Sequence, residues 1–297
     1  KQALIWLYSQ TYVITTSEYR FGANMRQWRL INDCPTTGAH NMAVDDAILT
    51  AVARGDAPPT LRFYDWSPPC LSLGYAQKSA DADLTRLAAA GWDVVRRPTG
   101  GRAILHIDEL TYSVAVPEDH PLASGGIVDS YRRISAALLA GLQRLGAQVD
   151  ARPREGSLRG AGPVCFEIAS HYEITVNGRK LVGSAQVRRR GGMLQHGAIP
   201  LAGDVARICD VLVYPDEAQR EAARAQVRSR AITVEEALGG HAPTWQQAAQ
   251  ALAEAFADVL DIELVPGTLS DAERQRAARL EQEVYTAPLD ARPIARS

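Results

Sequence analysis

Residues 172–200 read YEITVNGRKLVGSAQVRRRGGMLQHGAIP, and this stretch predicts three consecutive β-strands. Asn177-Gly178 is a strong signal for a two-residue hairpin turn, because both residue types tolerate the positive φ angles that such a turn needs. Apolar and small residues flank the turn on both sides. We therefore expect a hairpin followed by one further strand, over residues 171–176, 179–187 and 192–200.

The hairpin also contains residue types that are unusual for a plain structural strand. Lys180 lies on the returning strand beside Thr175, among apolar and small neighbours. If it is buried, its ammonium group could donate to an oxyanion or a carbonyl, or hold a thiolate. By propensity alone, a solvated lysine near the turn is the better interpretation. Gly183, Ser184 and Ala185 follow, and such small side chains leave room for a ligand or another backbone.

A second stretch, VVRRPTGGRAILH at residues 94–106, places two glycines directly after a predicted strand. Gly100 and Gly101 let backbone N–H groups approach a ligand closely. The flanking Arg97, Arg102 and His106 suggest that a polar or anionic group binds nearby. A glycine turn with solvated arginines is the alternative, because the motif matches neither a Walker loop nor a dinucleotide-binding fingerprint.

A third stretch, PVCFE at residues 163–167, contains the candidate nucleophile Cys165. A thiol beside an ammonium group such as that of Lys180 has a lowered pKa and becomes nucleophilic. A buried structural cysteine is the alternative, and without further information it is favoured. We expect that structural role for Cys34, Cys70 and Cys209, which have no comparable basic and glycine-rich surroundings.

The rest of the chain predicts an α/β domain followed by a helical part. Apolar periodicity and glycine stops predict helices over residues 41–54, 81–90, 128–145 and 245–260. Further strands are expected over residues 60–66, 70–75, 94–95 and 110–116, and a mobile polar loop over residues 151–162. Beyond Pro215 helices dominate, and Thr233 with Glu236 and Ser270 with Glu273 each fit a capping box. We expect a catalytic domain over residues 25–215 and a helical C-terminal subdomain over residues 216–297.

Composition narrows the class of protein. The 297 residues include 32 basic and 34 acidic side chains, so the net charge of −2 indicates neither a nucleic-acid nor a membrane partner. The four cysteines form no C-x-x-C pair and the six histidines show no spacing typical of a metal site, so no metal is expected. His196, between Gln195 and Gly197, suits a structural or pocket-lining role better than that of a general base. Residues 1–24 look like a non-native or disordered extension before Met25, the alternative being an ordered arm, and the remainder reads as cytoplasmic.

Together these stretches resemble the lipoate–protein ligase A and octanoyltransferase family, which has a biotin/lipoate ligase-like catalytic domain. The similarity is greatest to its octanoyl-[acyl carrier protein]:protein N-octanoyltransferases. The matching strings occur in family order between about Trp28 and Pro215, and the C-terminal part matches more loosely. They are RFYDWSPPCLSLGY, VVRRPTGGRAILH, DELTYSVAV, CFEIASHYE, GRKLVGSAQVRRRGGMLQHGAI and LVYP.

The resemblance implies an α/β (α+β) fold in which a mixed, curled sheet flanked by helices surrounds a narrow acyl tunnel. It assigns catalysis to Cys165 and Lys180. It assigns substrate binding to the two glycine-containing stretches and the later strand, by residues Arg97, Gly100, Gly101, His106, Gly183, Ser184, Ala185 and His196.

The implied reaction begins with octanoyl-acyl carrier protein as the donor. Cys165 takes the octanoyl group as a thioester, and Lys180 with nearby backbone N–H groups stabilises the oxyanion. A lysine of a lipoyl domain, such as that of glycine cleavage H protein, then attacks the thioester. Because thioester to amide is downhill, no cofactor is required. The sequence departs from the family pattern at His106-Ile107-Asp108-Glu109 and at Ala169-Ser170-His171-Tyr172, neither of which includes Cys165 or Lys180.

Other functions remain open at this stage. An ATP-dependent lipoate–protein ligase, with ATP and Mg²⁺, would form lipoyl-adenylate and use the same lysine and glycine loop. Only Cys165 in its CFE string distinguishes the transferase from that ligase. An amidotransferase that moves octanoyl between lipoyl domains would also use a thioester cysteine. A non-enzymatic acyl-binding protein is disfavoured because Lys180 and both loop glycines are present.

Overall fold

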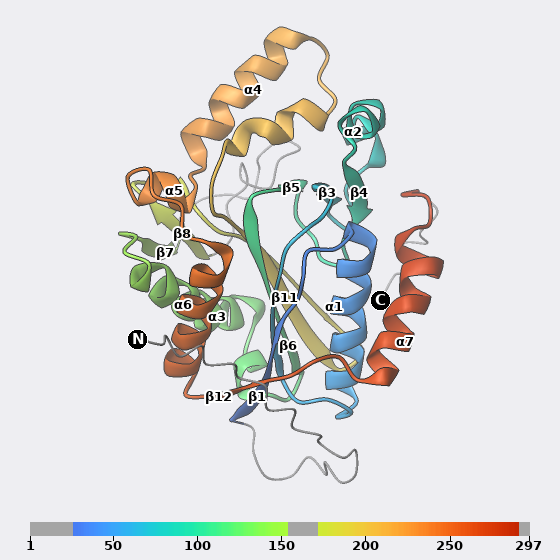
Figure 1. The fold of residues 1–297 in the computed structure, drawn as a ribbon, viewed down its shortest axis with the longest axis vertical. Coiled ribbons are helices and arrows are strands. Elements are labelled where there is room, and N and C mark those ends of the chain that lie inside the picture. The colour runs from blue at the N-terminus through green and yellow to red at the C-terminus, as the bar shows by residue number, and fades with distance from the viewer. Residues whose placement is uncertain (1–25, 154–171, 291–297) are drawn as a thin grey trace, which may run out of the picture.

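The computed structural model describes residues 26–153 and 172–290, and its centre is a six-stranded mixed sheet (Figure 1). The strand order is β10-β11-β6-β2-β1-β12. The antiparallel half pairs β2 with β6, β6 with β11 and β11 with β10, whereas β1 runs parallel to both β2 and β12. The bounds are β1 Gln27–Asn32, β2 Thr60–Tyr64, β6 Glu109–Pro117, β10 Gly183–Arg189, β11 Gly192–Pro200 and β12 Glu263–Pro266.

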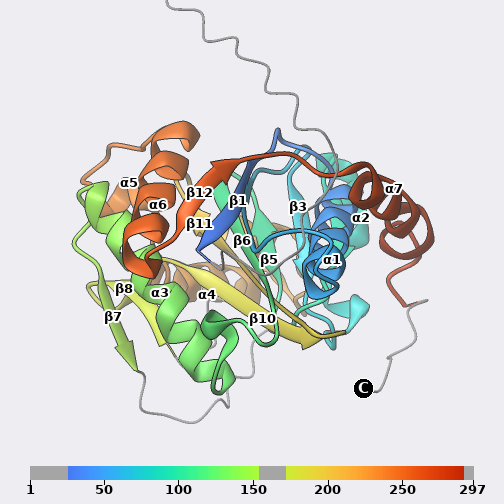
Figure 2. The ribbon, with the colours of Figure 1, turned by 90° about the horizontal axis from the view of Figure 1, so that it is seen from below.

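Helices cover both faces of this sheet (Figures 1 and 2). On one face, α1 (Gly38–Ala53) packs against β6 and β11, and α7 (Asp271–Leu280) packs outside α1. On the other, α3 (Ile127–Arg144) and α6 (Trp245–Leu260) pack against each other. Helix α1 is buried on nearly all sides between the sheet and α7, and α6 packs its buried residues, such as Leu252 and Phe256, toward α3 and the sheet, which removes apolar surface from water.

Two small three-stranded sheets complete the fold. The first has the order β4-β3-β5, from Cys70–Leu73 (β3), Asp93–Arg96 (β4) and Ile104–His106 (β5). The second has the order β7-β8-β9, from Asp150–Pro153 (β7), Tyr172–Val176 (β8) and Arg179–Lys180 (β9). The remaining helices are α2 Leu84–Ala90, α4 Glu217–Arg230 and α5 Val234–Ala237, with short 3₁₀ turns at Ser79–Asp81, Pro121–Ala123 and Val205–Val211 and a π-turn at Glu281–Tyr285.

The expected fold class, a mixed sheet flanked by helices with a helical C-terminal part, is confirmed. The turn at Asn177-Gly178 is also confirmed, with φ angles of 50° and 78°. The returning strand expected over residues 179–187 is wrong as one element. Lys180 pairs with Thr175 in β9, and the chain then leaves that sheet and enters the central sheet as β10. Leu181 and Val182 lie between β9 and β10 and are both buried in the core, so the chain passes from one sheet to the other through the interior.

Three smaller expectations also need correction. The start of the loop expected at residue 151 is instead strand β7, because it pairs with β8. The helix expected from residue 81 begins at Leu84, where the Asp83 side chain caps its first turn. Cys34 is exposed rather than buried, because it lies in the loop that follows the last residue of β1. Cys70 and Cys209 are buried, as expected. The expectations for residues 1–24, 154–162 and 164–167 lie outside the described residues.

The C-terminal part joins the central sheet as well as adding helices to it. Strand β12 extends the sheet beside β1, with Trp28 opposite Leu264. The Arg29 guanidinium of β1 forms a two-pronged ion pair with Glu273 of α7, at 2.7 and 2.6 Å. The boundary at residues 215 and 216 stays a prediction.

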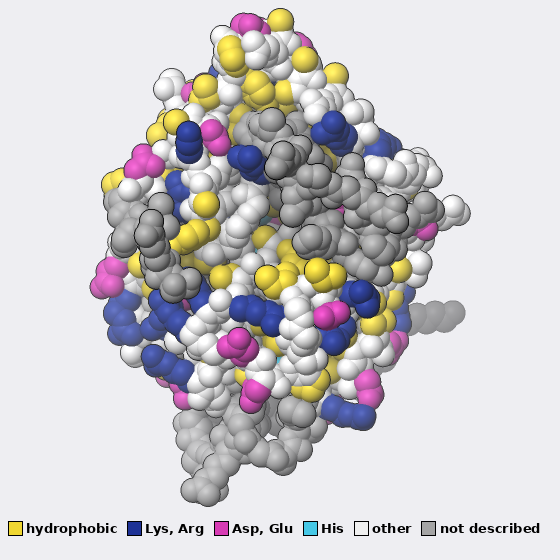
Figure 3. All heavy atoms as spheres, turned by 180° about the vertical axis from the view of Figure 1, so that it is seen from behind, with side chains coloured by type: hydrophobic (Ala, Val, Ile, Leu, Met, Phe, Trp, Pro, Cys, Tyr) yellow, Lys and Arg dark blue, Asp and Glu magenta, His cyan; other side chains and the backbone are white. Residues whose placement is uncertain are grey.

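Charge on the surface is mixed. On the face shown in Figure 3, basic and acidic side chains are interspersed with apolar ones, in line with the net charge of −2. Among residues 26–153 and 172–290, no helix combines the length and the apolar character that crossing a membrane requires.

The ion pair between β1 and α7 gives a stability prediction. Glu273→Gln leaves the Arg29 guanidinium buried beside a neutral amide, so we expect the free energy of unfolding in urea to fall by about 3 kcal/mol. Asp271→Asn, on the same helix, removes a carboxylate from a largely exposed pair with Arg274 and should change it by less than about 0.5 kcal/mol. Equal effects of the two substitutions would contradict this account of how α7 is attached.

Candidate functional site

A narrow cavity lies between the α1-side face of the central sheet and the small sheet β4-β3-β5. It is about 20 Å³ in volume, roughly the room that one water molecule occupies. A larger ligand therefore enters only when side chains around it move. Its wall is formed by Met42, Tyr64, Trp66, Ser72, Arg97, Ile104, His106, Thr111, Gly183, Ala185, His196, Gly197 and Ala198.

Strand register explains which side chains face this cavity. One row across the sheet consists of Gly183, Ala198, Thr111 and Tyr64, and the next contains Ala185 and His196. Side chains two positions apart on a strand share a face, so both rows lie on the side of α1. The side chains of Gly183 and Ala185 on β10 are small, and the space that they leave at this point is the cavity.

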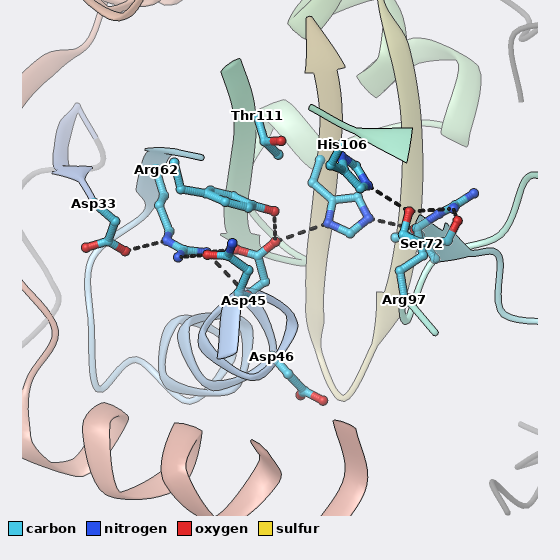
Figure 4. A network of polar contacts seen from close by, with 12 residues as sticks. Asp33, Asp45, Asp46, Arg62, Ser72, Arg97, His106 and Thr111 are labelled. Carbon is cyan, nitrogen blue, oxygen red and sulfur yellow. Dashed lines mark hydrogen bonds and ion pairs between the residues drawn. The ribbon is translucent and has the colours of Figure 1, made fainter. Parts of the chain in front are cut away.

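His196 is fixed from both sides in the first of two polar chains, which includes the Asp45 side chain labelled in Figure 4. Its Nδ1 lies 3.1 Å from the Asp45 carboxylate of α1, and its Nε2 lies 2.7 Å from the Thr99 hydroxyl. Asp45 also accepts hydrogen bonds from Arg62 at 2.8 Å and from Tyr64 at 2.9 Å. A buried carboxylate with three donors joins helix α1, strand β2 and strand β11 at one point.

The charge state of this chain follows from its surroundings. Burial lowers the pKa of His196, and this effect outweighs the hydrogen bond and the charge of Asp45, which raise it. For Asp45, burial raises the pKa, but the hydrogen bond from His196 and the charge of Arg62 outweigh it, so the carboxyl stays ionised. Burial and the charge of Asp45 raise the pKa of Tyr64 well above its usual range, so its phenol remains a donor.

His106 belongs to the second chain. Its Nε2 lies 2.7 Å from the Ser72 hydroxyl and its Nδ1 lies 2.8 Å from the Glu109 carboxylate. The Trp66 ring stacks on the imidazole with 3.9 Å between ring centroids and 14° between planes. Thr111 accepts from the Trp66 indole N–H and donates to the same Glu109 oxygen.

Arg97 connects the second chain to the glycine loop. Its guanidinium donates to the Ser72 hydroxyl at 3.1 Å and to the backbone carbonyls of Gly100 and Arg102 at 2.8 and 2.6 Å. The loop also passes close to Gly74, the residue that follows β3. A Cβ added to Gly74 would lie only 2.0 Å from the carbonyl oxygen of Gly101, so only glycine fits there. Gly101 itself has a φ of 91°, which favours glycine. The loop is thus held by a buried cation and by close backbone contact.

The structure brings five of the expected site residues together in the cavity wall: Arg97, His106, Gly183, Ala185 and His196. Gly100 and Gly101 lie in the loop that Arg97 holds. The Ser184 side chain points to the opposite face of the sheet, where it bonds the Tyr112 hydroxyl at 2.7 Å, so it is not part of the cavity wall.

Lys180 and Cys165 stand apart from this group. Lys180 is buried, so the solvated alternative is wrong, and its ammonium lies 3.3 Å from the Glu173 carboxylate. It is not in the cavity wall, but the Cα atoms of Lys180 and Gly183 can be at most about 10 Å apart along the chain. Cys165 lies outside the described residues.

Sequence reasoning missed the groups that hold the histidines, namely Asp45, Arg62, Ser72, Thr99 and Glu109. One signal was available: Asp45 and Asp46 interrupt the apolar side of a helix in the run NMAVDDAIL. A carboxylate at such a position needs buried donors. Within residues 26–153 and 172–290, no group of three or more His, Cys, Asp or Glu side chains is placed to hold a metal ion.

The neutral His196 makes stability depend on pH. In the unfolded chain His196 takes up a proton below its ordinary pKa of about 6.5, whereas the folded protein resists protonation, so stability is full above that pH and falls as pH falls. Between pH 7 and pH 5 this group should cost up to about 2 kcal/mol of unfolding free energy. In His196→Gln the pH-dependent loss should shrink by that amount, while the exposed-site control His241→Gln keeps the wild-type dependence. An undiminished pH-dependent loss in His196→Gln, measured by urea unfolding, would contradict a neutral, buried His196.

Comparison with known proteins places this site in a family. A family model described as the lipoyl protein ligase A/B catalytic domain matches residues 37–257. The protein named octanoyltransferase LipM from Kyrpidia tusciae is 45% identical, over 86% of this chain and 95% of its own. Its namesake from Brevibacillus brevis is 40% identical, over 88% and 97%.

Solved structures agree with these sequences. A bipartite lipoate protein ligase from Thermoplasma acidophilum, solved in work on an archaeal lipoylation system with its E2 lipoyl domain, superposes with a TM-score of 0.72 at 27% identity, over 86% of this chain and 92% of its own. A lipoate-protein ligase A bound with ATP superposes with a TM-score of 0.71 at 26% identity, over 86% and 95%. The chain therefore belongs to the lipoyl protein ligase A/B catalytic domain family.

Proposed function

We propose that this protein is an acyltransferase of lipoate biosynthesis that transfers octanoyl from octanoyl-acyl carrier protein to a lysine of a lipoyl domain, such as that of glycine cleavage H protein. The observation that carries the proposal is 45% identity to an octanoyltransferase over 95% of its length. The cavity supports it, because its wall combines small and apolar side chains with the Arg97 guanidinium. Such a wall suits an apolar chain that ends in a polar carbonyl.

The proposed reaction has two steps. The Cys165 thiolate attacks the donor carbonyl, a carbon–sulfur bond forms to Cys165, the carbon–sulfur bond to the carrier breaks, and the carrier leaves as a thiolate that takes a proton from water. The acceptor lysine then attacks the new thioester, the amide bond forms, and Cys165 is released as a thiol after the amine loses a proton. Because an amide is more stable than the thioester that is consumed, the proposed transfer is downhill without ATP.

Lys180 is proposed to stabilise the oxyanion of both steps, together with backbone N–H groups of the glycine loop. Its burial supports this role, since a cation that is removed from water interacts more strongly with a developing negative charge. Glu173 compensates the ammonium in the resting protein at 3.3 Å. Arg97 and His106 would contact the acyl group from the other side of the cavity.

The ligase alternative is supported by the structural similarity to a lipoate-protein ligase A bound with ATP. An acyl-adenylate mechanism would use Lys180 and the glycine loop but would not need a thiol. The amidotransferase alternative shares the thiol mechanism and differs only in the donor. The choice of donor therefore separates all three functions.

The first test offers the purified protein an unmodified lipoyl domain with one of three donors: octanoyl-acyl carrier protein, octanoate with ATP and Mg²⁺, or octanoylated H protein. Mass spectrometry of the acceptor measures the gain of one octanoyl group. We expect product with the carrier protein and no ATP. Product only with octanoate and ATP would identify a ligase, and product only with octanoylated H protein would identify an amidotransferase.

The second test concerns the thioester. Cys165→Ala should abolish transfer from octanoyl-acyl carrier protein, because no other group is proposed to accept the acyl chain. Cys34→Ser, which alters an exposed cysteine of the described residues, is the matched control and should keep wild-type transfer. In the wild type, neutral hydroxylamine should remove an octanoyl adduct from the Cys165 peptide. Full activity of Cys165→Ala would refute the covalent mechanism.

A further inference from the structure

The two histidines of the cavity have matching partners. Each lies between a carboxylate and a hydroxyl: Glu109, His106 and Ser72 form one chain, and Asp45, His196 and Thr99 form the other. Both chains end at the glycine loop of residues 97–102. Thr99 belongs to that loop, and Ser72 contacts it through Arg97. The loop is therefore held from two sides by the same kind of polar chain.

In the chain of Glu109, His106 and Ser72, the donors and acceptors that are available determine the direction of the hydrogen bonds. Arg97 has only N–H donors, so the Ser72 hydroxyl accepts from it at 3.1 Å. The indole of Trp66 also only donates, so Thr111 accepts from Trp66 and turns its own proton to Glu109. The Glu109 carboxylate can only accept, and it needs a proton on His106 Nδ1. When Nδ1 carries the only ring proton, the lone pair lies at Nε2, where the Ser72 hydroxyl at 2.7 Å can donate to it.

The chain of Asp45, His196 and Thr99 runs in the same direction. Asp45 is ionised and accepts from Arg62, Tyr64 and His196, so Nδ1 of His196 bears the proton. His196 is neutral, and its Nε2 accepts from the Thr99 hydroxyl at 2.7 Å. Each carboxylate thus selects one tautomer of its histidine, and each tautomer presents an acceptor to the hydroxyl that holds the loop.

We propose that Glu109 and Asp45 are positioning residues, which fix the tautomers of His106 and His196 so that Ser72 and Thr99 hold the glycine loop against the acyl cavity. Only the kinetic test of this proposal rests on the proposed function, because it measures octanoyl transfer. The proposal goes beyond that function, because it gives both carboxylates and both hydroxyl groups the role of holding the loop in place. None of these groups is proposed to contact the reacting atoms.

A serine–histidine–carboxylate chain also resembles the nucleophile of a serine hydrolase, and the surroundings of Ser72 argue against that role. Ser72 lies in the middle of β3, is 0% exposed, and its oxygen already accepts from Arg97. The Arg97 guanidinium occupies one of the two lone pairs of the Ser72 oxygen and lowers its nucleophilicity, although Ser72 lies in the cavity wall. A fluorophosphonate probe that labelled Ser72 would overturn the positioning role; we expect no label there.

The main test uses two matched pairs of variants. Thr99→Val keeps the shape of the side chain and removes the hydroxyl, while Thr99→Ser keeps the hydroxyl. Glu109→Met removes the acceptor for His106 at similar length, while Glu109→Gln keeps an acceptor oxygen. We expect kcat for octanoyl transfer to fall about 30-fold in Thr99→Val and Glu109→Met, with KM for the carrier protein changed less than about threefold. Thr99→Ser and Glu109→Gln should recover most of that loss.

A second readout does not depend on activity. Hydrogen–deuterium exchange of the peptide over residues 97–103 should become about 10-fold faster in Thr99→Val and Glu109→Met, and return toward wild type in Thr99→Ser and Glu109→Gln. Peptides of α6 serve as the internal reference and should not change. Unchanged exchange at residues 97–103, or equal effects within each pair, would overturn the proposal. Absent transfer in the wild type would instead refute the proposed function, and the exchange result would still decide this inference.

Discussion

The buried carboxylate of Asp45 organises the centre of this protein. It is 0% exposed and receives hydrogen bonds from Arg62 and Tyr64 of β2 and from His196 of β11. Removing a carboxylate and a guanidinium from water costs about as much as their attraction returns, so the pair adds little net stability. What it does is fix orientation, because helix α1 can satisfy Asp45 in only one position over the sheet. His196, Thr99 and the glycine loop follow from that position.

The cavity depends on the same arrangement. Gly183 and Ala185 leave space on β10, but that space becomes a site because Arg97, His106 and His196 are held around it by buried partners. A buried polar group without partners costs about 1–3 kcal/mol, so each chain must be complete to be tolerated. The polar side chains of the wall are thus preorganised, and because the cavity is small, the proposed acyl chain would have to displace apolar neighbours when it binds.

Much of this could be predicted from the sequence, for physical reasons that differ between regions. The turn at Asn177-Gly178, helix α6 and strands β6 and β11 were found because local periodicity and turn chemistry determine them. The split between β9 and β10 was missed because strand patterns do not show which sheet a strand joins. Asp45, Ser72 and Thr99 were missed because their roles depend on pairing across 34 to 151 positions, as between Asp45 and His196. Glu109 lies only three positions from His106, but the sequence does not show that both side chains are buried against each other. Lys180 was singled out, but propensity favoured a solvated side chain, and its burial and its partner Glu173 follow only from the fold.

We propose that the acyl chain binds between β10 and the small sheet, under the loop that the two histidine chains hold. A crystal structure of the protein with a non-hydrolysable octanoyl thioester analogue tests it most directly. The account predicts density for the chain against Gly183, Ala185 and His196, with the carbonyl end toward Lys180 and both histidine chains intact. Density for the octanoyl group outside this cavity, or chains broken on binding, would contradict it.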